Sequence, residues 1–405
     1  MRIIVVNDHG SITGGAAQVA IASLNELANR SFDVTFVSAS APVDNRIDQD
    51  KVRVINYGVH ELISSPSKID AAIHGIWDAR CAKKIGILLD EHDPQETVVH
   101  LHTWVKSLTS SVIHKILSSG FKLIVTLHDY FAVCPNGGLF NYQKQTHCEI
   151  TPMSMSCLLT NCDARSYAQK LWRYGRHVVQ RQVAGMPSSV ENFISISDYS
   201  ERILRPYLPT TAKIYRVRNP IEIDFQMPAS PSNNDLFSFV GRLSPEKGGE
   251  LFARAARSAN VPAAFIGTGA EAQAISEVYP DAQMHGWQNR LGVISAISSS
   301  RALVFPSLWH ETQGLVVLEA AALGIPSIVS DGCAAADYVI HGESGMHFKS
   351  GDVEDLAKGL KILENDKELV KHMGQNAYKN YWNNPCTLEN HILDLLQCYS
   401  KIMRN

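Results

Sequence analysis

Two glutamates, Glu311 and Glu319, stand eight positions apart where an apolar run gives way to a helical pattern. Residues 302–326 predict a strand, a polar loop and a helix, with Glu311 in the loop and Glu319 about two turns into the helix. A loop that enters a helix N-terminus offers free backbone N–H groups and a partial positive charge, which favour a phosphate. The alternative is that Glu319 is a solvated charge on a half-buried helix.

Basic residues and glycines recur at the neighbouring predicted strand ends. Arg242 directly follows Gly241, and Arg242 and Lys247 bracket a tight turn before a helix. A guanidinium fork and an ammonium beside a helix N-terminus suit a diphosphate, although isolated basic residues are usually solvated. Gly267 ends the next strand and falls on the same predicted edge. These residues therefore predict an anion-binding site.

The first half of the chain carries two further sets of polar residues at strand ends. Gly14 and Gly15 stand between the first predicted strand and a helix, where glycine allows a ligand close to the backbone. A tight turn is the alternative. His128 and Asp129 follow the strand 122–127, and we expect them to face a cleft. The alternative is a core histidine hydrogen-bonded to its neighbour.

Four of the eight cysteines, Cys134, Cys148, Cys157 and Cys162, cluster within 134–162, which would form a long insertion. In a cytosolic protein such a cluster favours a structural zinc site over disulfides. The spacing lacks a tight C-x2-C pair, so reduced packing cysteines and disulfides stay open as alternatives.

A basic segment, 167–183, follows the cysteines and mixes Lys170, Arg173, Arg176 and Arg181 with apolar and aromatic residues. A basic amphipathic helix with a tryptophan is able to lie on an anionic membrane surface. The alternative is an ordinary helix on a domain face with solvated charges.

These residues sit on a regular alternation of short apolar runs, such as 97–101, and helical stretches, such as 71–89 and 106–118. This alternation predicts an α/β fold with doubly wound, mostly parallel sheets. A Pro-, Ser- and Asn-rich segment, 219–234, interrupts the pattern, and a second alternating series follows. We expect two Rossmann-like domains that face each other across a cleft, at 1–218 and 219–385, with the final helix, 386–405, packing back on the first domain.

Composition fits an ordinary protein of about two domains, with 405 residues, 45% hydrophobic and 19% charged. A net charge of −3 gives no general case for nucleic acid. No stretch reaches about 18 consecutive apolar residues, so no transmembrane helix is expected. The N-terminus predicts a strand rather than a signal peptide, and we expect a cytoplasmic protein that attaches at most peripherally to the inner face of the plasma membrane.

In this order and spacing, the residues resemble those of the retaining nucleotide-sugar glycosyltransferases of family 4, also called glycosyl group 1, which have the two-domain GT-B fold. The resemblance covers almost the whole chain. It rests on Gly14-Gly15, His128-Asp129, Gly241-Arg242, Glu246-Lys247-Gly248, the pair Glu311 and Glu319, Asp331-Gly332 and 341–345.

The resemblance implies a role for each matching residue. Arg242 and Lys247 would neutralise the donor diphosphate, and Glu319 would accept hydrogen bonds from the ribose hydroxyls. Glu311 would contact the transferred sugar. The N–H groups of Gln313, Gly314 and Leu315 would face the phosphate, His128 would lie near the reacting carbon, and Gly14, Gly15, Gly241 and Gly267 would shape the donor site, with His9 and Asp129 on the acceptor side.

The activity so implied is transfer of a hexose from a UDP- or GDP-sugar to a hydroxyl of a glycan or lipid-linked acceptor, in bacterial O-antigen, capsule or exopolysaccharide synthesis. Configuration would be retained without a carboxylate nucleophile and without a required metal. The alternatives are a non-catalytic sugar-nucleotide-binding subunit and an NAD-dependent oxidoreductase, which the missing dinucleotide fingerprint disfavours. The sequence departs from the family at Thr312-Gln313 and at Asp337, which leaves the donor sugar open.

Overall fold

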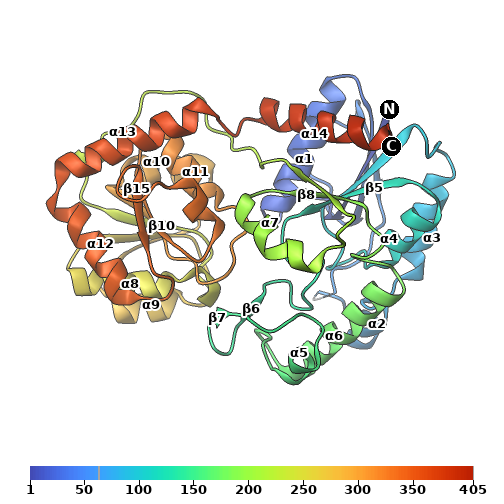
Figure 1. Cartoon of the computed structure of the whole chain (residues 1–405), viewed down its shortest axis with the longest axis horizontal. Helices are drawn as coiled ribbons and strands as arrows, with labels where there is room; N and C mark the ends of the chain where they lie inside the picture. Colours follow the sequence, from blue (N-terminus) through green and yellow to red (C-terminus); the bar gives the residue numbers. More distant parts are fainter. Residues whose placement is uncertain (63, 405) are drawn as a thin grey trace.

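The computed structural model describes residues 1–62 and 64–404, so the final predicted segment, 386–405, is described except for its last residue. Two lobes lie side by side, each built on one parallel sheet (Figure 1). The first sheet has seven strands in the order β3-β2-β1-β4-β5-β8-β9. Its strands are β1 (Arg2–His9), β2 (Asp33–Ser40), β3 (Val52–Asn56), β4 (Thr97–Leu101), β5 (Lys122–Leu127), β8 (Asn192–Ser195) and β9 (Lys213–Arg216).

The second sheet has six parallel strands in the order β12-β11-β10-β13-β14-β15. They are β10 (Phe237–Val240), β11 (Ala263–Ile266), β12 (Gln283–Gly286), β13 (Ala302–Phe305), β14 (Ser327–Ser330) and β15 (Gly345–Phe348). The prediction of two doubly wound parallel sheets is confirmed. A separate antiparallel hairpin, β6 (Phe140–Asn141) and β7 (Thr146–His147), lies within the cysteine-bearing insertion.

Helices cover both faces of each sheet. In the first lobe they are α1 (Gly15–Asn29), α2 (Lys68–His74), α3 (Ala79–Leu89), α4 (Ser111–Ser118), α5 (Met155–Leu159), α6 (Tyr167–Gln182) and α7 (Asp198–Leu204). In the second they are α8 (Gly249–Ala259), α9 (Ala272–Val278), α10 (Arg290–Ser298), α11 (Leu315–Ala322), α12 (Val353–Asn365) and α13 (Lys367–Asn383), and α14 (Leu388–Met403) ends the chain. Short 3₁₀ turns span Arg205–Tyr207, Pro231–Asn233, Pro245–Lys247 and Ala334–Tyr338.

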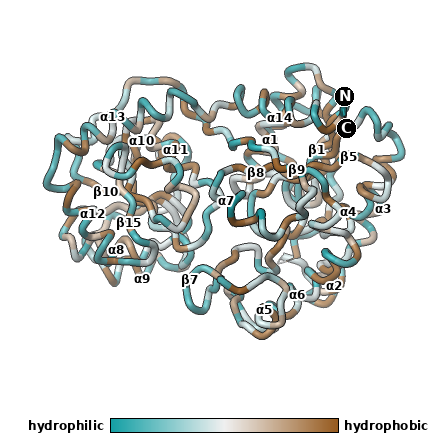
Figure 2. The backbone as a smooth tube through the Cα atoms, in the orientation of Figure 1, coloured by the Kyte–Doolittle hydropathy of each residue, from teal (hydrophilic) through white to brown (hydrophobic). Residues whose placement is uncertain are grey.

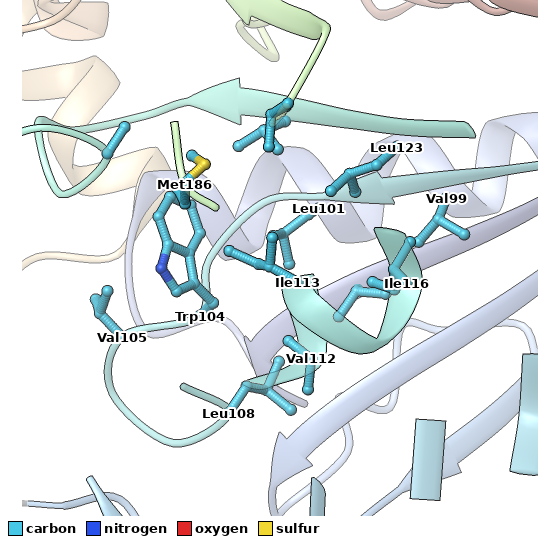
Figure 3. Close-up of a cluster of buried hydrophobic side chains, with 14 of the residues drawn as sticks. Val99, Leu101, Trp104, Val105, Leu108, Val112, Ile113, Ile116, Leu123 and Met186 are labelled. Carbon is cyan, nitrogen blue, oxygen red and sulfur yellow. The ribbon is translucent and has the colours of Figure 1, made fainter. Parts of the chain in front are cut away.

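The cores lie between sheets and helices, where most strand residues are buried. Figure 2 shows hydrophobic residues, coloured brown, in the strands of both lobes. Figure 3 shows one of these clusters, in which Trp104 packs against Met186 beside residues of β4 and α4. Strands buried on both faces read as continuous apolar runs, which is why most strand boundaries could be predicted from the sequence.

Two helices differ from the prediction, and the structure also shows where the final helix packs. The single helix expected over 71–89 is two helices, because Asp78 caps the N-terminus of α3 with its side chain. The helix expected from residue 106 begins at Ser111, because the carboxylate of buried Asp8 accepts hydrogen bonds from the N–H groups of 106–108. The final helix, α14, lies against α1 (Figure 1), and Tyr399 on α14 contacts His100 Nδ1 through its hydroxyl at 2.7 Å.

Candidate active site

The loop between β13 and α11 meets the loop after β10 at one edge of the second sheet. Lys247 Nζ donates to Glu311 Oε2, and Trp309 Nε1 donates to the same oxygen at 3.0 Å. The ammonium also lies 5.1 Å from the centroid of the Trp309 ring. The structure therefore brings the predicted phosphate-binding lysine and the predicted sugar-binding glutamate together as an ion pair.

Arg242 is held on the same edge but is more open to solvent. Its Nη2 donates to Glu246 Oε1 at 2.8 Å, while 67% of its side chain is exposed and Glu246 is buried. Both predicted phosphate-binding cations thus have a carboxylate partner in the absence of donor. A diphosphate at this edge would exchange those partners for its own oxygens.

Two of the predicted glycines have a steric reason to be glycine. Gly267 has a φ of 144°, and a Cβ there would lie 1.9 Å from the carbonyl oxygen of Gly241. Gly314 caps α11 with a φ of 78°, in the left-handed region that side chains rarely adopt. The ends of β10 and β11 thus lie close together, and Gly314 leaves the first N–H groups of α11 without a side-chain cap.

Glu319 lies on α11, and its side chain is 15% exposed. Its Oε1 accepts a hydrogen bond from Arg290 Nη1 at 3.3 Å. Burial raises the pKa of Glu319, and the nearby Arg290 charge opposes that rise. Arg290 was not predicted as a site residue, since it opens the helix α10 and no local pattern connects it to α11.

On the first lobe, His128 and Asp129 follow β5 as predicted. His128 Nε2 lies 2.9 Å from Nδ1 of His102, a residue that directly follows β4. The two rings stack with their centroids 5.2 Å apart. Burial lowers the pKa of His128 to about 3, so its ring is neutral at ordinary pH. His102 follows the same rule of a polar residue at a strand end, so the sequence carried a signal for it.

The carboxyl group of Asp129 accepts a hydrogen bond from the Phe131 N–H at 2.9 Å, and burial raises its pKa from 3.8 to about 6. The folded chain thus binds this proton more tightly than the unfolded chain, and stability falls as the pH rises from 3.8 to about 6.

Asp129→Asn should remove that pH dependence. Between pH 3.8 and about 6 the parent should lose about 1–2 kcal/mol of its free energy of unfolding relative to the variant. The variant is therefore favoured at the higher pH. Urea unfolding at both ends measures it. An equal slope in both proteins would show that Asp129 titrates normally.

The glycine loop before α1 lies opposite the start of α11. A Cβ on Gly15 would lie 4.0 Å from Cδ1 of Leu315, and one on Gly14 would meet no atom within 4 Å. The two helix N-termini, one from each lobe, thus face the same space. His9 at the end of β1 is buried, with Nδ1 3.1 Å from Glu61 Oε1 and Nε2 unpartnered.

Direct contacts join the lobes around the Glu311 loop. The Thr312 hydroxyl donates to the carbonyl of His128 at 2.9 Å, so the family departure at Thr312 forms an interlobe hydrogen bond. Within the second domain, buried Gln313 donates through Nε2 to the carbonyl of Asn219, at the start of the linker, at 3.4 Å. From α7, the Tyr199 hydroxyl lies 2.6 Å from His310 Nδ1 and donates to the Gly332 carbonyl. Nothing in the sequence pattern pointed to Tyr199.

The four clustered cysteines are all free, and three of them, Cys134, Cys157 and Cys162, lie near Lys170 of α6. Cys157 accepts a hydrogen bond from Lys170, and burial raises the pKa of Cys162 while the Lys170 charge opposes the rise. Within the described parts of the chain, no three His, Cys, Asp or Glu residues are grouped so as to hold a metal ion. The arrangement shows no disulfide among the four, and the zinc site stays a prediction.

The basic helix α6 does not present the charged face that its sequence predicted. Lys170 is fully buried, Arg173 pairs with Asp163, and Arg176 donates to the Val105 carbonyl and stacks on the Trp172 ring. Of its four cations only Arg181 is exposed. Among helices that the structure describes, none is long and apolar enough to cross a membrane.

Two family models match the chain in succession. One described as Glycosyltransferase Family 4 matches residues 13–225, and one described as Glycosyl transferases group 1 matches residues 220–380.

Curated relatives match weakly or in part. The capsular polysaccharide biosynthesis glycosyltransferase CapM of Staphylococcus aureus is 34% identical over 90 residues, 22% of this chain and 23% of CapM. An uncharacterized 42.6 kDa protein in the cps region of Klebsiella pneumoniae is 24% identical over 80% of this chain and 83% of its own length. The match to the sulfoquinovosyl transferase SQD2 of Arabidopsis thaliana covers 28% of that protein. The chain therefore spans less than a third of the length of CapM and of SQD2.

Solved structures resemble the whole chain. Anabaena Alr3699/HepE in complex with UDP superposes with a TM-score of 0.68 at 15% identity, covering 99% of this chain and 100% of that one. Sucrose-phosphate synthase from Thermosynechococcus elongatus gives 0.71 at 16% identity, covering 100% and 99%. At such identities the likeness concerns the fold, and it confirms the predicted GT-B architecture.

Proposed function

Since the chain belongs to Glycosyltransferase Family 4, whose members are retaining hexosyltransferases, we propose that it transfers a hexose from a UDP- or GDP-sugar to a hydroxyl of a glycan or lipid-linked acceptor. The observation that carries this proposal is the contact of Lys247, Glu311 and Trp309 at the start of α11, opposite Gly15 of the other lobe. Cations, a helix N-terminus and a sugar-binding carboxylate in one cleft suit a nucleoside-diphosphate sugar.

In this proposal, donor binding breaks the pairs that the cations form in the free protein. Lys247 moves from Glu311 to a phosphate oxygen, which frees Glu311 to accept hydrogen bonds from the sugar hydroxyls. Arg242 likewise exchanges Glu246 for the diphosphate, and the N–H groups of 313–315 stabilise the charge that develops on the leaving phosphate. Glu319 accepts hydrogen bonds from the ribose.

The chemistry then depends mainly on position and charge. The leaving phosphate oxygen takes the proton of the acceptor hydroxyl on the same face of the sugar, so configuration is retained without a carboxylate nucleophile. Neutral His128 lies beside the reacting carbon without adding a second positive charge to an oxocarbenium-like transition state. His9 and Asp129 line the acceptor side.

We place the product in a bacterial surface polysaccharide, because CapM is named for capsular polysaccharide biosynthesis and the Klebsiella relative lies in a cps region. A lipid-linked acceptor would bring the chain to a membrane. Exposed apolar side chains on α2, α5 and α6 would then make the contact: Ile69, Ile73, Met155, Leu159, Leu171 and Val178. Co-sedimentation with neutral and anionic liposomes tests this, and no binding to either would exclude it.

Thermal unfolding with UDP, GDP, ADP and NAD tests the donor class. We expect UDP or GDP to raise the melting temperature, since a ligand that binds only the folded state at 100 times its Kd adds about 2.7 kcal/mol. Stabilisation by NAD alone would overturn the proposal. Loss of product formation in a variant that still binds nucleotide would exclude the non-catalytic alternative.

A further inference from the structure

The side chain of Lys170 is 0% exposed, although lysine is among the residues least often buried. Its Nζ donates to Cys157 Sγ at 3.2 Å and lies 5.9 Å from the centroid of the Tyr174 ring. In the described chain no ion pair between Lys170 and a carboxylate is found, whereas the neighbouring Arg173 does pair with Asp163. Sulfur therefore takes the place that a carboxylate usually has beside a buried lysine.

This arrangement is unusual in energy and in chemistry. An ammonium removed from water without an anion costs several kcal/mol, so its contact with Cys157 Sγ supplies the partner that the buried charge needs. Two nucleophilic atoms, Lys170 Nζ and Cys157 Sγ, are thereby held 3.2 Å apart in a buried site. Cys157 and Cys162 are both buried, so a reagent that modifies either thiol has to be small, of the size of dioxygen.

We propose that Lys170 and Cys157 form an oxidant-sensitive modification site, at which dioxygen joins Nζ to Sγ through one oxygen atom. The balance is Cys157–SH plus Lys170–NH2 plus O2 giving Cys157–S–O–NH–Lys170 plus water. The S–H bond and one N–H bond break, and new S–O and N–O bonds form. Sulfur and nitrogen each lose two electrons, and the two oxygen atoms of dioxygen gain four.

The bridge would tie α5 to α6 across the cysteine-bearing insertion. The same insertion carries His147, whose ring stacks on His310 with centroids 3.7 Å apart and an interplanar angle of 18°. His310 directly precedes Glu311. The modification would therefore restrict the movement of the insertion, whose His147 packs against the loop of the candidate site. The modification itself does not depend on the proposed activity.

Intact mass spectrometry of the full chain is the test. One sample is purified and kept under argon with reductant, and a second is exposed to air-saturated buffer. We expect the second to gain about 14 Da, one oxygen added and two hydrogens lost, on a cross-linked pair of peptides that contain Lys170 and Cys157, and to lose it on treatment with dithiothreitol.

Matched variants separate the site from general oxidation. Cys157→Ser and Lys170→Met should not gain this mass, and Cys386→Ser, which removes a buried cysteine of the other lobe, should gain it normally. Should Lys170→Met not fold, peptide mapping of the unmodified sequence decides. A loss of about 2 Da from a disulfide between Cys157 and Cys162, a gain of about 16 Da on one cysteine, or one zinc per chain bound by the four cysteines would each overturn the proposal.

Discussion

Replacing Lys247 with alanine should lower kcat/KM for the donor by about 100- to 1,000-fold, the loss seen when one preorganised donor to a developing oxyanion is removed. The main effect should fall on kcat, because the ammonium neutralises charge that grows on the leaving phosphate. Lys247 lies beside Trp309 and is only 21% exposed, so bulk water would replace it poorly. Steady-state kinetics with the nucleotide sugar that stabilises the protein measure the loss.

The control is Lys371→Ala, which removes a half-exposed lysine of α13 that pairs with Glu368. It should leave kcat/KM unchanged. Glu311→Gln should also lower activity, and the double variant should lose less than the sum of the two single losses, because each residue is the other's partner in the free protein. Full activity in Lys247→Ala would show that the donor phosphate binds elsewhere.

The fold was largely predictable because its signals are local. The strand 97–101 is apolar and buried on both faces, and its two ends match the prediction. The break between α2 and α3 also has a local signal that was overlooked, since Asp78 is a good N-cap residue in the middle of the expected helix. Sequence patterns therefore identified the strand ends that carry the candidate site and most of the elements, but not β9 or the hairpin β6–β7.

The partners of the site residues were much less predictable, because they come from elements far apart in the chain. Periodicity assigns Lys170 to a basic helix, but only the packing of the insertion decides that the side chain points to Cys157 rather than to solvent. In the same way, Thr312 appeared as a departure from the family, and its hydrogen bond to the His128 carbonyl spans 184 positions. Such contacts depend on how the two lobes meet.

Replacing Glu319 with alanine should weaken nucleotide binding by about 100-fold while leaving kcat at saturating donor within a few-fold of the parent value. Hydrogen bonds to a charged group contribute about 1.5–3 kcal/mol each, and about 1.4 kcal/mol corresponds to a tenfold change in Kd. The carboxylate is 15% exposed and would hold the ribose, which does not react, so its contribution is the same in the ground state and the transition state.

Isothermal titration calorimetry with the stabilising nucleotide measures this Kd directly. Glu319→Gln should lose less than Glu319→Ala, since the amide oxygen still accepts a hydrogen bond, and Glu277→Ala on exposed α9 should bind as the parent does. Arg290 loses its hydrogen bond to residue 319 in Glu319→Ala and only the opposite charge in Glu319→Gln. It keeps the Glu222 carbonyl in both variants, so the lobe should remain folded. A large fall in kcat with an unchanged Kd would place Glu319 at the reacting sugar, and Glu311 would then have to hold the ribose.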